Sequence, residues 1–135
     1  MDLIEKAKSY YRAYERHDPD FVAGELADGF TFTSPFDDHI GREDYFRRCW
    51  PPTPDDGEPL HQKFDFIAIA QDGERVTIVY QATMRRPNAT HPDMTFRNAE
   101  MMTFENGKLK SVEVFFGDPP GGLTRHAFAV QSGAG

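Results

Sequence analysis

The stretch TFRNAEMMTFE, residues Thr95–Glu105, continues through Asn106-Gly107 into KLKSVEVFF, residues Lys108–Phe116. Asn-Gly is the residue pair that two-residue hairpin turns favour, because both positions of such a turn need positive φ. The sequence therefore predicts an antiparallel hairpin in the last third of the chain.

The first strand of this hairpin has two different faces, because side chains two residues apart share a face. One face holds Thr95, Arg97, Ala99, Met101, Thr103 and Glu105, and the other holds Phe96, Asn98, Glu100, Met102 and Phe104. If the second face points inward, desolvation favours the neutral form of Glu100 and raises its pKa above the usual ~4.3. Such a group can donate a hydrogen bond or act as a base near neutral pH. The alternative is a structural glutamate paired with an Arg or Lys.

Two more strands are predicted before the hairpin. Lys63–Gln71 is rich in aromatic and β-branched residues and ends at Asp72-Gly73. Arg75–Arg85 alternates strictly and places Val76, Ile78, Tyr80, Ala82 and Met84 on one face. With loops over residues 53–59 and 87–92, this half of the chain reads as a meander of antiparallel strands.

The first half of the chain is mainly helical. Asp2 and Glu5 have capping-box spacing, and the apolar residues that follow have helical periodicity, so we expect a helix over Leu3–Arg16. A second helix is predicted from Pro19 through Leu26. A short strand over Phe30–Thr33, a polar loop over 37–39 and a third helix over Arg42–Trp50 follow.

Helices followed by strands indicate an α+β fold with the helices on one face of the sheet. The length of 135 residues suits one domain. We place that domain at residues 1–118, because Asp-Pro-Pro-Gly-Gly begins at Asp118 and breaks the pattern. Residues 119–135 form a tail that either docks on the domain or stays loose.

Composition argues against several partners. The net charge of −7 and the lack of a basic stripe argue against nucleic acid. The longest apolar run, residues 66–70, is far too short to span a membrane, and the charged N-terminus does not read as a signal peptide. A single cysteine, Cys49, fits a reducing compartment, so a cytoplasmic location is expected. The five histidines lack paired-ligand spacing, so we expect neither metal nor cofactor.

Five local patterns can be compared with known families: residues 9–18 (SYYRAYERHD), 32–35 (FTSP), 41–46 (GREDYF), 99–109 (AEMMTFENGKL) and 115–117 (FFG). Together they resemble the NTF2-like superfamily, in its branch of SnoaL-like polyketide cyclases and ketosteroid isomerases. The resemblance implies a cone, with about three N-terminal helices packed on a strongly curved, mainly antiparallel sheet that encloses an apolar cavity. It also implies a homodimer and a small apolar ligand.

The resemblance also assigns candidate catalytic residues. Ketosteroid isomerases use a tyrosine and a protonated acid as an oxyanion hole and an aspartate as base. The matching positions hold Tyr10, Glu100 and Ser34, so the tyrosine and the acid are present and the base is missing. Asp38 or His39, in the adjacent loop, would then supply the base.

We expect the cavity to be lined by Tyr14, Phe32, Ser34, Phe96, Asn98, Met102 and Phe116. Three functions stay open at this point. The protein is an isomerase, cyclase or dehydratase acting by proton transfer on an apolar carbonyl compound, a non-catalytic carrier using the same cavity, or a protein-interaction module whose cavity is filled by side chains.

Overall fold

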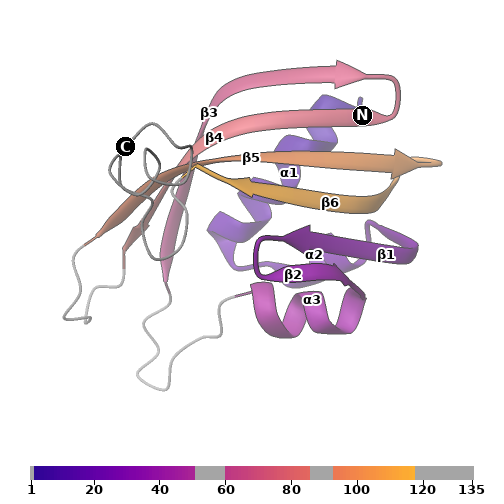
Figure 1. Cartoon of the computed structure of the whole chain (residues 1–135), viewed down its shortest axis with the longest axis horizontal. Coiled ribbons are helices and arrows are strands. Elements are labelled where there is room, and N and C mark those ends of the chain that lie inside the picture. The colour runs from indigo at the N-terminus through magenta and orange to yellow at the C-terminus, as the bar shows by residue number, and fades with distance from the viewer. Residues whose placement is uncertain (1, 51–59, 86–92, 118–135) are drawn as a thin grey trace, which may run out of the picture.

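The first helix of the protein begins and ends where its capping residues predict. The computed structural model describes residues 2–50, 60–85 and 93–117 (Figure 1). Helix α1 spans Leu3–Arg16, and the Asp2 side chain accepts a 2.8 Å hydrogen bond from the Glu5 amide at its start. His17 ends the helix in the left-handed conformation at φ 59°.

The second helix is shorter than the sequence predicts. Helix α2 spans Pro19–Ala23, with Asp18 accepting a hydrogen bond from the Phe21 amide. Leu26, predicted as helical, instead starts strand β1, Leu26–Ser34, where it lies opposite Leu109. Pairing with the sheet therefore overrides the helical pattern at this position.

The segment predicted as a polar loop is a strand. Strand β2, Asp37–Ile40, pairs antiparallel with β1, and helix α3, Arg42–Cys49, follows it directly. This expectation was wrong because charged side chains at a solvent-exposed sheet edge look like loop composition in the sequence.

The remaining strands form the predicted meander. They are β3, His61–Asp72, β4, Arg75–Arg85, β5, Met94–Glu105, and β6, Lys108–Phe116. The six strands lie in the order β2-β1-β6-β5-β4-β3, and only the β1–β6 pair is parallel. The Asn106-Gly107 turn joins β5 to β6 with both residues at positive φ.

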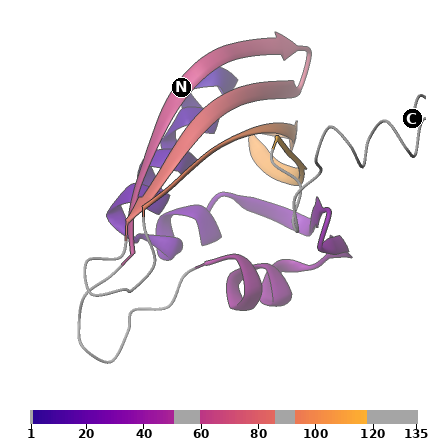
Figure 2. The same cartoon turned by 60° about the vertical axis from the view of Figure 1, so that its left-hand side comes forward.

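The sheet is strongly bent but does not close on itself (Figure 2). Helix α1 lies along its concave side against β3 and β4, and α3 packs on β1. Three helices on a curled, mostly antiparallel six-stranded sheet confirm the predicted α+β NTF2-like fold.

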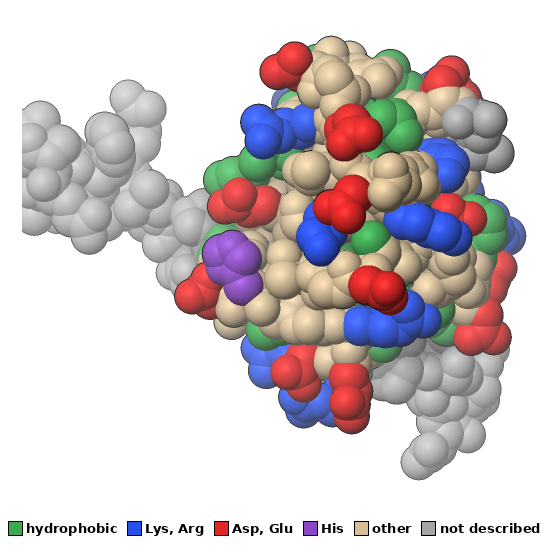
Figure 3. All heavy atoms as spheres, turned by 90° about the vertical axis from the view of Figure 1, so that its right-hand side faces the viewer, with side chains coloured by type: hydrophobic (Ala, Val, Ile, Leu, Met, Phe, Trp, Pro, Cys, Tyr) green, Lys and Arg blue, Asp and Glu red, His purple; other side chains and the backbone are tan. Residues whose placement is uncertain are grey.

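The face in Figure 3 carries acidic and basic side chains side by side, with no stripe of one charge. No helix in the described ranges is both long and apolar enough to cross a bilayer. The predicted loops at 53–59 and 87–92 and the tail at 119–135 lie outside the described residues.

Candidate functional site

The concave side of the sheet holds a cavity of about 710 Å³. Aromatic side chains form much of its wall, and they come from α1, β1, β3, β4, β5 and β6. They are Tyr11, Tyr14, Phe32, Phe64, Tyr80, Phe96 and Phe116. The volume lies within the usual range for small-molecule sites.

Glu100 is the buried acid of this cavity. The alternation of β5 turns its side chain inward, as predicted, between Ile78 of β4 and Val114 of β6. Burial raises the pKa of Glu100 from its ordinary value of 4.5 to about 7, although hydrogen bonds from Tyr11 and Tyr80 act to lower it. Burial outweighs both hydrogen bonds, so the carboxyl group is poised to gain or lose a proton at neutral pH.

Tyr11, and not the predicted Tyr10, is the α1 partner of Glu100. The Tyr11 hydroxyl donates a hydrogen bond to the Glu100 carboxyl. Successive helical residues point about 100° apart, so only one of the two tyrosines can face the cavity. Tyr10 instead stacks on Phe104, and its buried hydroxyl has no hydrogen-bond partner among the described residues. The prediction for Tyr10 is corrected accordingly.

The Tyr11 ring is fixed by aromatic packing. Its centroid lies 5.3 Å from that of Phe64, 5.3 Å from that of Phe66 and 5.1 Å from that of Tyr80, each at an edge-to-face angle. Such contacts hold the ring in one orientation, which aims its hydroxyl at Glu100.

Asn98 and Tyr80 extend the polar group. They are directly opposite each other on β5 and β4, and the Asn98 amide nitrogen donates a 3.2 Å hydrogen bond to the Tyr80 hydroxyl. Asn98 is only 8% exposed. The Asn98–Tyr80 pair thus lies beside Glu100 in the β4–β5 register, and Tyr11 approaches the carboxyl group from the helix.

Tyr14 of the cavity wall is paired with Tyr45 of α3, which borders the small second cavity. The hydroxyls of Tyr14 and Tyr45 are hydrogen-bonded to each other, and the Tyr14 ring stacks on Trp50 at a centroid distance of 4.0 Å. Burial raises the pKa of Tyr14 well above its ordinary range, so this hydroxyl stays protonated and can serve as a donor.

Gln62 of β3 places an amide in the cavity wall. Its side-chain nitrogen is buried and has no hydrogen-bond partner among the described residues. A buried amide donor without a partner is costly, and a bound ligand oxygen would satisfy it.

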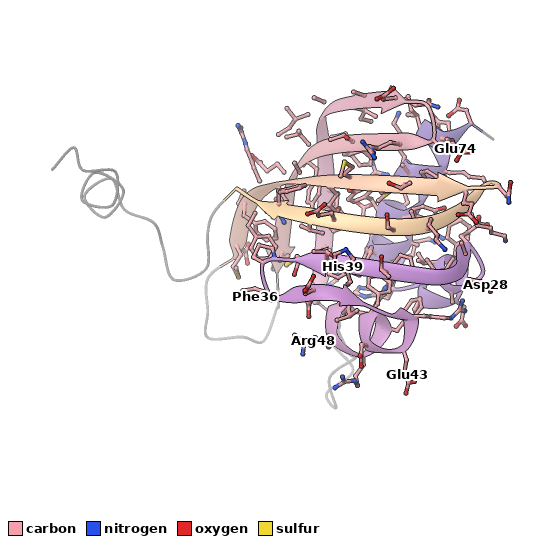
Figure 4. All side chains as sticks on the ribbon, turned by 45° about the vertical axis from the view of Figure 1, so that its right-hand side comes forward. Asp28, Phe36, His39, Glu43, Arg48 and Glu74 are labelled. Carbon is pink, nitrogen blue, oxygen red and sulfur yellow. The ribbon has the colours of Figure 1, made fainter. Side chains whose placement is uncertain are left out.

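Neither predicted base lies in the cavity wall. The side chains of Asp38 and His39 are 92% and 72% exposed, and they pair with each other at 2.6 Å on the edge strand β2. Figure 4 labels His39 at the β1–β2 edge of the sheet. Asp38 and His39 were expected to lie in a loop that borders the cavity. The pairing of β1 with β2 instead places both residues at the outer edge of the sheet.

Ser34 has a structural role in the same region. Its hydroxyl donates to Asp37 at 3.0 Å, and the Asp37 carboxylate, 8% exposed, also accepts a 2.6 Å hydrogen bond from Arg48 of α3. These contacts tie the β1–β2 corner to α3, and Ser34 is not among the cavity-lining residues.

The other predicted lining residues divide into two groups. Tyr14, Phe32, Phe96, Asn98 and Phe116 line the cavity. Met102 instead borders a second, much smaller cavity of about 20 Å³, which Tyr10 and Glu100 also border. Met102 therefore lies behind Glu100 and away from the main cavity.

The residue patterns did not assign a site role to three residues that the structure adds, Tyr11, Tyr80 and Gln62. Predicting the role of Tyr11 requires the rotation of α1 about its axis. Predicting the role of Tyr80 requires the register of β4 against β5. The periodicity of β4 does place Tyr80 on the inward face, so its direction, though not its partner, was predictable.

The cavity wall also contains the thiol of Cys49, whose pKa burial raises to about 11. The thiol is therefore neutral and unreactive near neutral pH. Within residues 2–50, 60–85 and 93–117, no three His, Cys, Asp or Glu side chains cluster in a way that could hold a metal ion.

A bent sheet with a single buried carboxyl group in an aromatic cavity defines a class of small-molecule-binding folds. The family model of the SnoaL-like domain matches residues 7–112, so the chain belongs to this family. No curated protein matches the chain by sequence.

Solved structures of low sequence identity share the fold. An epoxide hydrolase of LEH-like type from M. tuberculosis is 13% identical, with a TM-score of 0.67 over 84% of this chain and 80% of the other. A putative SnoaL-like polyketide cyclase from Jannaschia sp. CCS1 is 12% identical, with a TM-score of 0.66 over 84% of each chain. An uncharacterised cystatin-fold protein from Novosphingobium aromaticivorans is 18% identical, with a TM-score of 0.66 over 85% and 98%.

Proposed function

We propose that this protein is a proton-transfer enzyme that acts on a neutral, largely apolar carbonyl compound, as an isomerase, cyclase or dehydratase. The observation that carries the proposal is the Glu100 carboxyl group, set in an aromatic cavity wall with its pKa raised to about 7 by burial. Structural neighbours include a putative cyclase and an epoxide hydrolase, which supports a ligand-processing role for the cavity.

The charge of the cavity wall favours a neutral substrate. Glu100 and Asp93 are its two acidic members, and no Lys, Arg or His of the described residues lines it. An anionic ligand would meet these carboxylates without a compensating cation, which is unfavourable in an apolar site.

In the proposed step, the Glu100 carboxylate removes a proton from the carbon next to the substrate carbonyl. The C–H electron pair forms the C=C bond of an enolate, and the carbonyl oxygen takes the negative charge. Protonated Glu100 then returns the proton to the same or another carbon. A group with a pKa near the working pH can both accept and return the proton, because neither its ionised nor its protonated form is strongly disfavoured.

The enolate oxygen needs hydrogen-bond donors fixed in advance. Two groups of the cavity wall are suited to this task, the unpartnered amide nitrogen of Gln62 and the protonated hydroxyl of Tyr14. We assign the oxyanion role to them in place of Tyr10, whose side chain packs in the core.

Exchange of α-hydrogens tests this proposal without knowledge of the natural substrate. The apolar ketone 2-tetralone is incubated in D₂O with the protein, and loss of the α-proton signals is followed by NMR. We expect exchange above the buffer rate for the native chain, and a fall of at least about tenfold for Glu100→Gln, because its amide cannot accept the proton.

Two controls sharpen the result. Asp38→Asn and His39→Gln remove the exposed acid and imidazole without touching the cavity, and exchange should stay within about twofold of the native rate. If 2-tetralone binds but exchanges only at the buffer rate, the protein is a carrier and the proposed enzyme activity is wrong.

We also propose that the protein forms a homodimer through the outer face of the sheet. Across four strands this face carries an apolar row of Ala68, Val79, Ala99 and Phe115, paired in register. Phe115 is 50% exposed in the single chain. Phe115→Glu should yield a monomer in sedimentation equilibrium, and an unchanged mass would exclude this face.

The single cysteine supports a cytoplasmic location, which we propose on that ground alone.

A further inference from the structure

Two side chains of α1, Arg12 and Glu15, bind the backbone of β3 at Phe64. The Glu15 carboxylate accepts a 2.9 Å hydrogen bond from the Phe64 amide, and the Arg12 guanidinium donates a 3.1 Å hydrogen bond to the Phe64 carbonyl oxygen. The guanidinium also pairs with the Glu15 carboxylate at 2.7 Å. One ion pair of the helix therefore binds both backbone polar groups of a single residue of β3.

The Phe64 backbone can be bound in this way because β3 is an edge strand of the sheet. In an antiparallel pair, every second residue directs its amide and its carbonyl group away from the partner strand. At the edge of a sheet these groups have no neighbouring strand, so they need other partners. Arg12 and Glu15 supply a donor and an acceptor in place of the missing strand, and they join α1 to the sheet at a defined point.

The same contacts surround the ring of Tyr11. Glu15 lies one helical turn after Tyr11, on the same side of α1. The rings of Phe64 and Phe66 each pack edge-to-face on Tyr11 at a centroid distance of 5.3 Å. The Arg12 guanidinium lies over the Phe66 ring, 4.7 Å from its centroid. The ion pair thus holds both the side of the helix that carries Tyr11 and the two rings of β3 that pack on it.

We propose that Arg12 and Glu15 are positioning residues, which fix α1 on β3 so that the Tyr11 hydroxyl meets the Glu100 carboxyl group. Neither residue lines the cavity, so both act on the acid through Tyr11 and not by contact with a ligand. Because the ionised carboxylate gains most from the Tyr11 donor, the ion pair helps to set the pH at which Glu100 changes its protonation state. The inference rests on the proposed function for the importance of Glu100, but it concerns the protein without ligand and is tested there.

Other groups packed around Glu100 also influence its ionisation. On the sheet it lies between Ile78 and Val114, which are apolar. The titratable groups besides Tyr11 come from α1, α3 and β4, burial raises the pKa of each, and they are Tyr14, Tyr45, Cys49 and Tyr80. Asp93 is the other acid of the cavity wall, and no Lys, Arg or His of the described residues lines it. The substitutions of the test leave all these groups in place, so their influence cancels between the proteins.

The test is a titration of Glu100 in Glu15→Ala, followed by ¹³C NMR of the glutamate carboxyl carbons. Alanine favours the helix but leaves the Phe64 amide without its acceptor, so the Tyr11 hydroxyl is held less firmly on Glu100. The Glu100 midpoint should then rise by about half a pH unit. Direct charge has the opposite sign, because removing a negative charge makes a nearby carboxyl group easier to ionise and lowers its midpoint. A rise therefore identifies positioning.

Two variants control for charge and for the helix. Glu15→Gln removes the same charge but keeps an oxygen that can accept from the Phe64 amide, so its midpoint should not exceed the native one. Glu5→Ala removes an exposed glutamate that pairs with Lys8 of the same helix at 3.6 Å, and the midpoint should stay within about 0.2 pH unit. A rise in either control as large as that in Glu15→Ala would overturn the proposal.

A double variant tests whether Glu15 acts through Tyr11. If it does, Glu15→Ala should give no rise of the Glu100 midpoint once Tyr11→Phe is present. A midpoint that is unchanged or lowered in Glu15→Ala alone, or an equal rise in the Tyr11→Phe background, would also overturn the proposal. None of these readouts needs turnover, so a lack of enzyme activity would refute the proposed function and leave this inference standing.

Discussion

The Tyr11 hydroxyl donates a hydrogen bond to the Glu100 carboxyl group across 89 residues of sequence, joining the first helix to the strand that carries the acid. This contact keeps the carboxyl group at the junction of α1 and the sheet, in the wall of the cavity. The acid is therefore buried and hydrogen-bonded at the same time, which gives it a pKa near neutrality and not an extreme one.

Tyr11→Phe removes this donor while keeping the ring that packs on Phe64 and Phe66. We expect the Glu100 titration midpoint to rise by about one pH unit, because the ionised form loses a charge-assisted hydrogen bond. The measurement is a carboxyl ¹³C NMR titration of glutamate-labelled protein, with the Glu100 signal assigned by its loss in Glu100→Gln.

Tyr10→Phe is the matched control for that variant. It makes the same change one residue earlier, where the hydroxyl has no hydrogen-bond partner among the described residues. The Glu100 midpoint should not move, and stability should be unchanged or slightly higher. Equal shifts in both variants would contradict the assignment of Tyr11.

Glu100→Gln should be more stable than the native chain above neutral pH. The folded-state pKa of Glu100, about 7, lies above its ordinary value of 4.5, so the folded state favours the protonated form. Its contribution to stability is fully present below about pH 4.5 and is lost as pH rises through 7. Between pH 4.5 and pH 8, the free energy of unfolding of Glu100→Gln relative to the native chain should increase by up to about 3 kcal/mol.

Urea unfolding of both proteins at several pH values measures this difference, and the other titrating groups cancel in the comparison. A stability difference that is the same at pH 4.5 and pH 8 would show that Glu100 is solvated and ordinary.

Asp37→Asn should destabilise the β1–β2 corner. The Asp37 side chain is 8% exposed, and its carboxylate accepts hydrogen bonds from Ser34 and Arg48. The neutral asparagine of the variant loses the charge-assisted hydrogen bond, at a cost of about 1–2 kcal/mol. Asp38→Asn, at the adjacent and 92% exposed position, should change the free energy of unfolding by less than about 0.5 kcal/mol. Thermal unfolding checks both, and equal losses would contradict the role of Asp37.

Local patterns predicted most of the fold. The strand alternation around Glu100, the Asn106-Gly107 turn and the Asp2 cap are each decided by residues close in sequence, and all three appear as expected. The edge strand β2 and the short helix α2 were not predictable in this way. Helix α2 ends early because β1 pairs with β6, which is distant in sequence. Strand β2 pairs with its neighbour β1, and it was missed because its charged side chains resemble loop composition.

The site was predicted less completely for the same reason. Glu100 and Asn98 followed from the face pattern of one strand. Choosing between Tyr10 and Tyr11 requires the rotation of α1 against the sheet, a tertiary property to which a helix with three tyrosines gives no clue. Asp38 and His39 were chosen for their chemistry, and only the fold shows that they face solvent.

The most direct test of the account is binding of 2-naphthol, a neutral apolar hydrogen-bond donor, measured by calorimetry between pH 5.5 and pH 8.5. The ionised Glu100 carboxylate accepts a hydrogen bond from the naphthol hydroxyl, so affinity should rise as pH passes through about 7, the pKa of Glu100. The rise should be absent in Glu100→Gln. An affinity that is independent of pH in the native protein, or equal in the two proteins at pH 8.5, would contradict the claim that Glu100 is the proton-carrying group of this cavity.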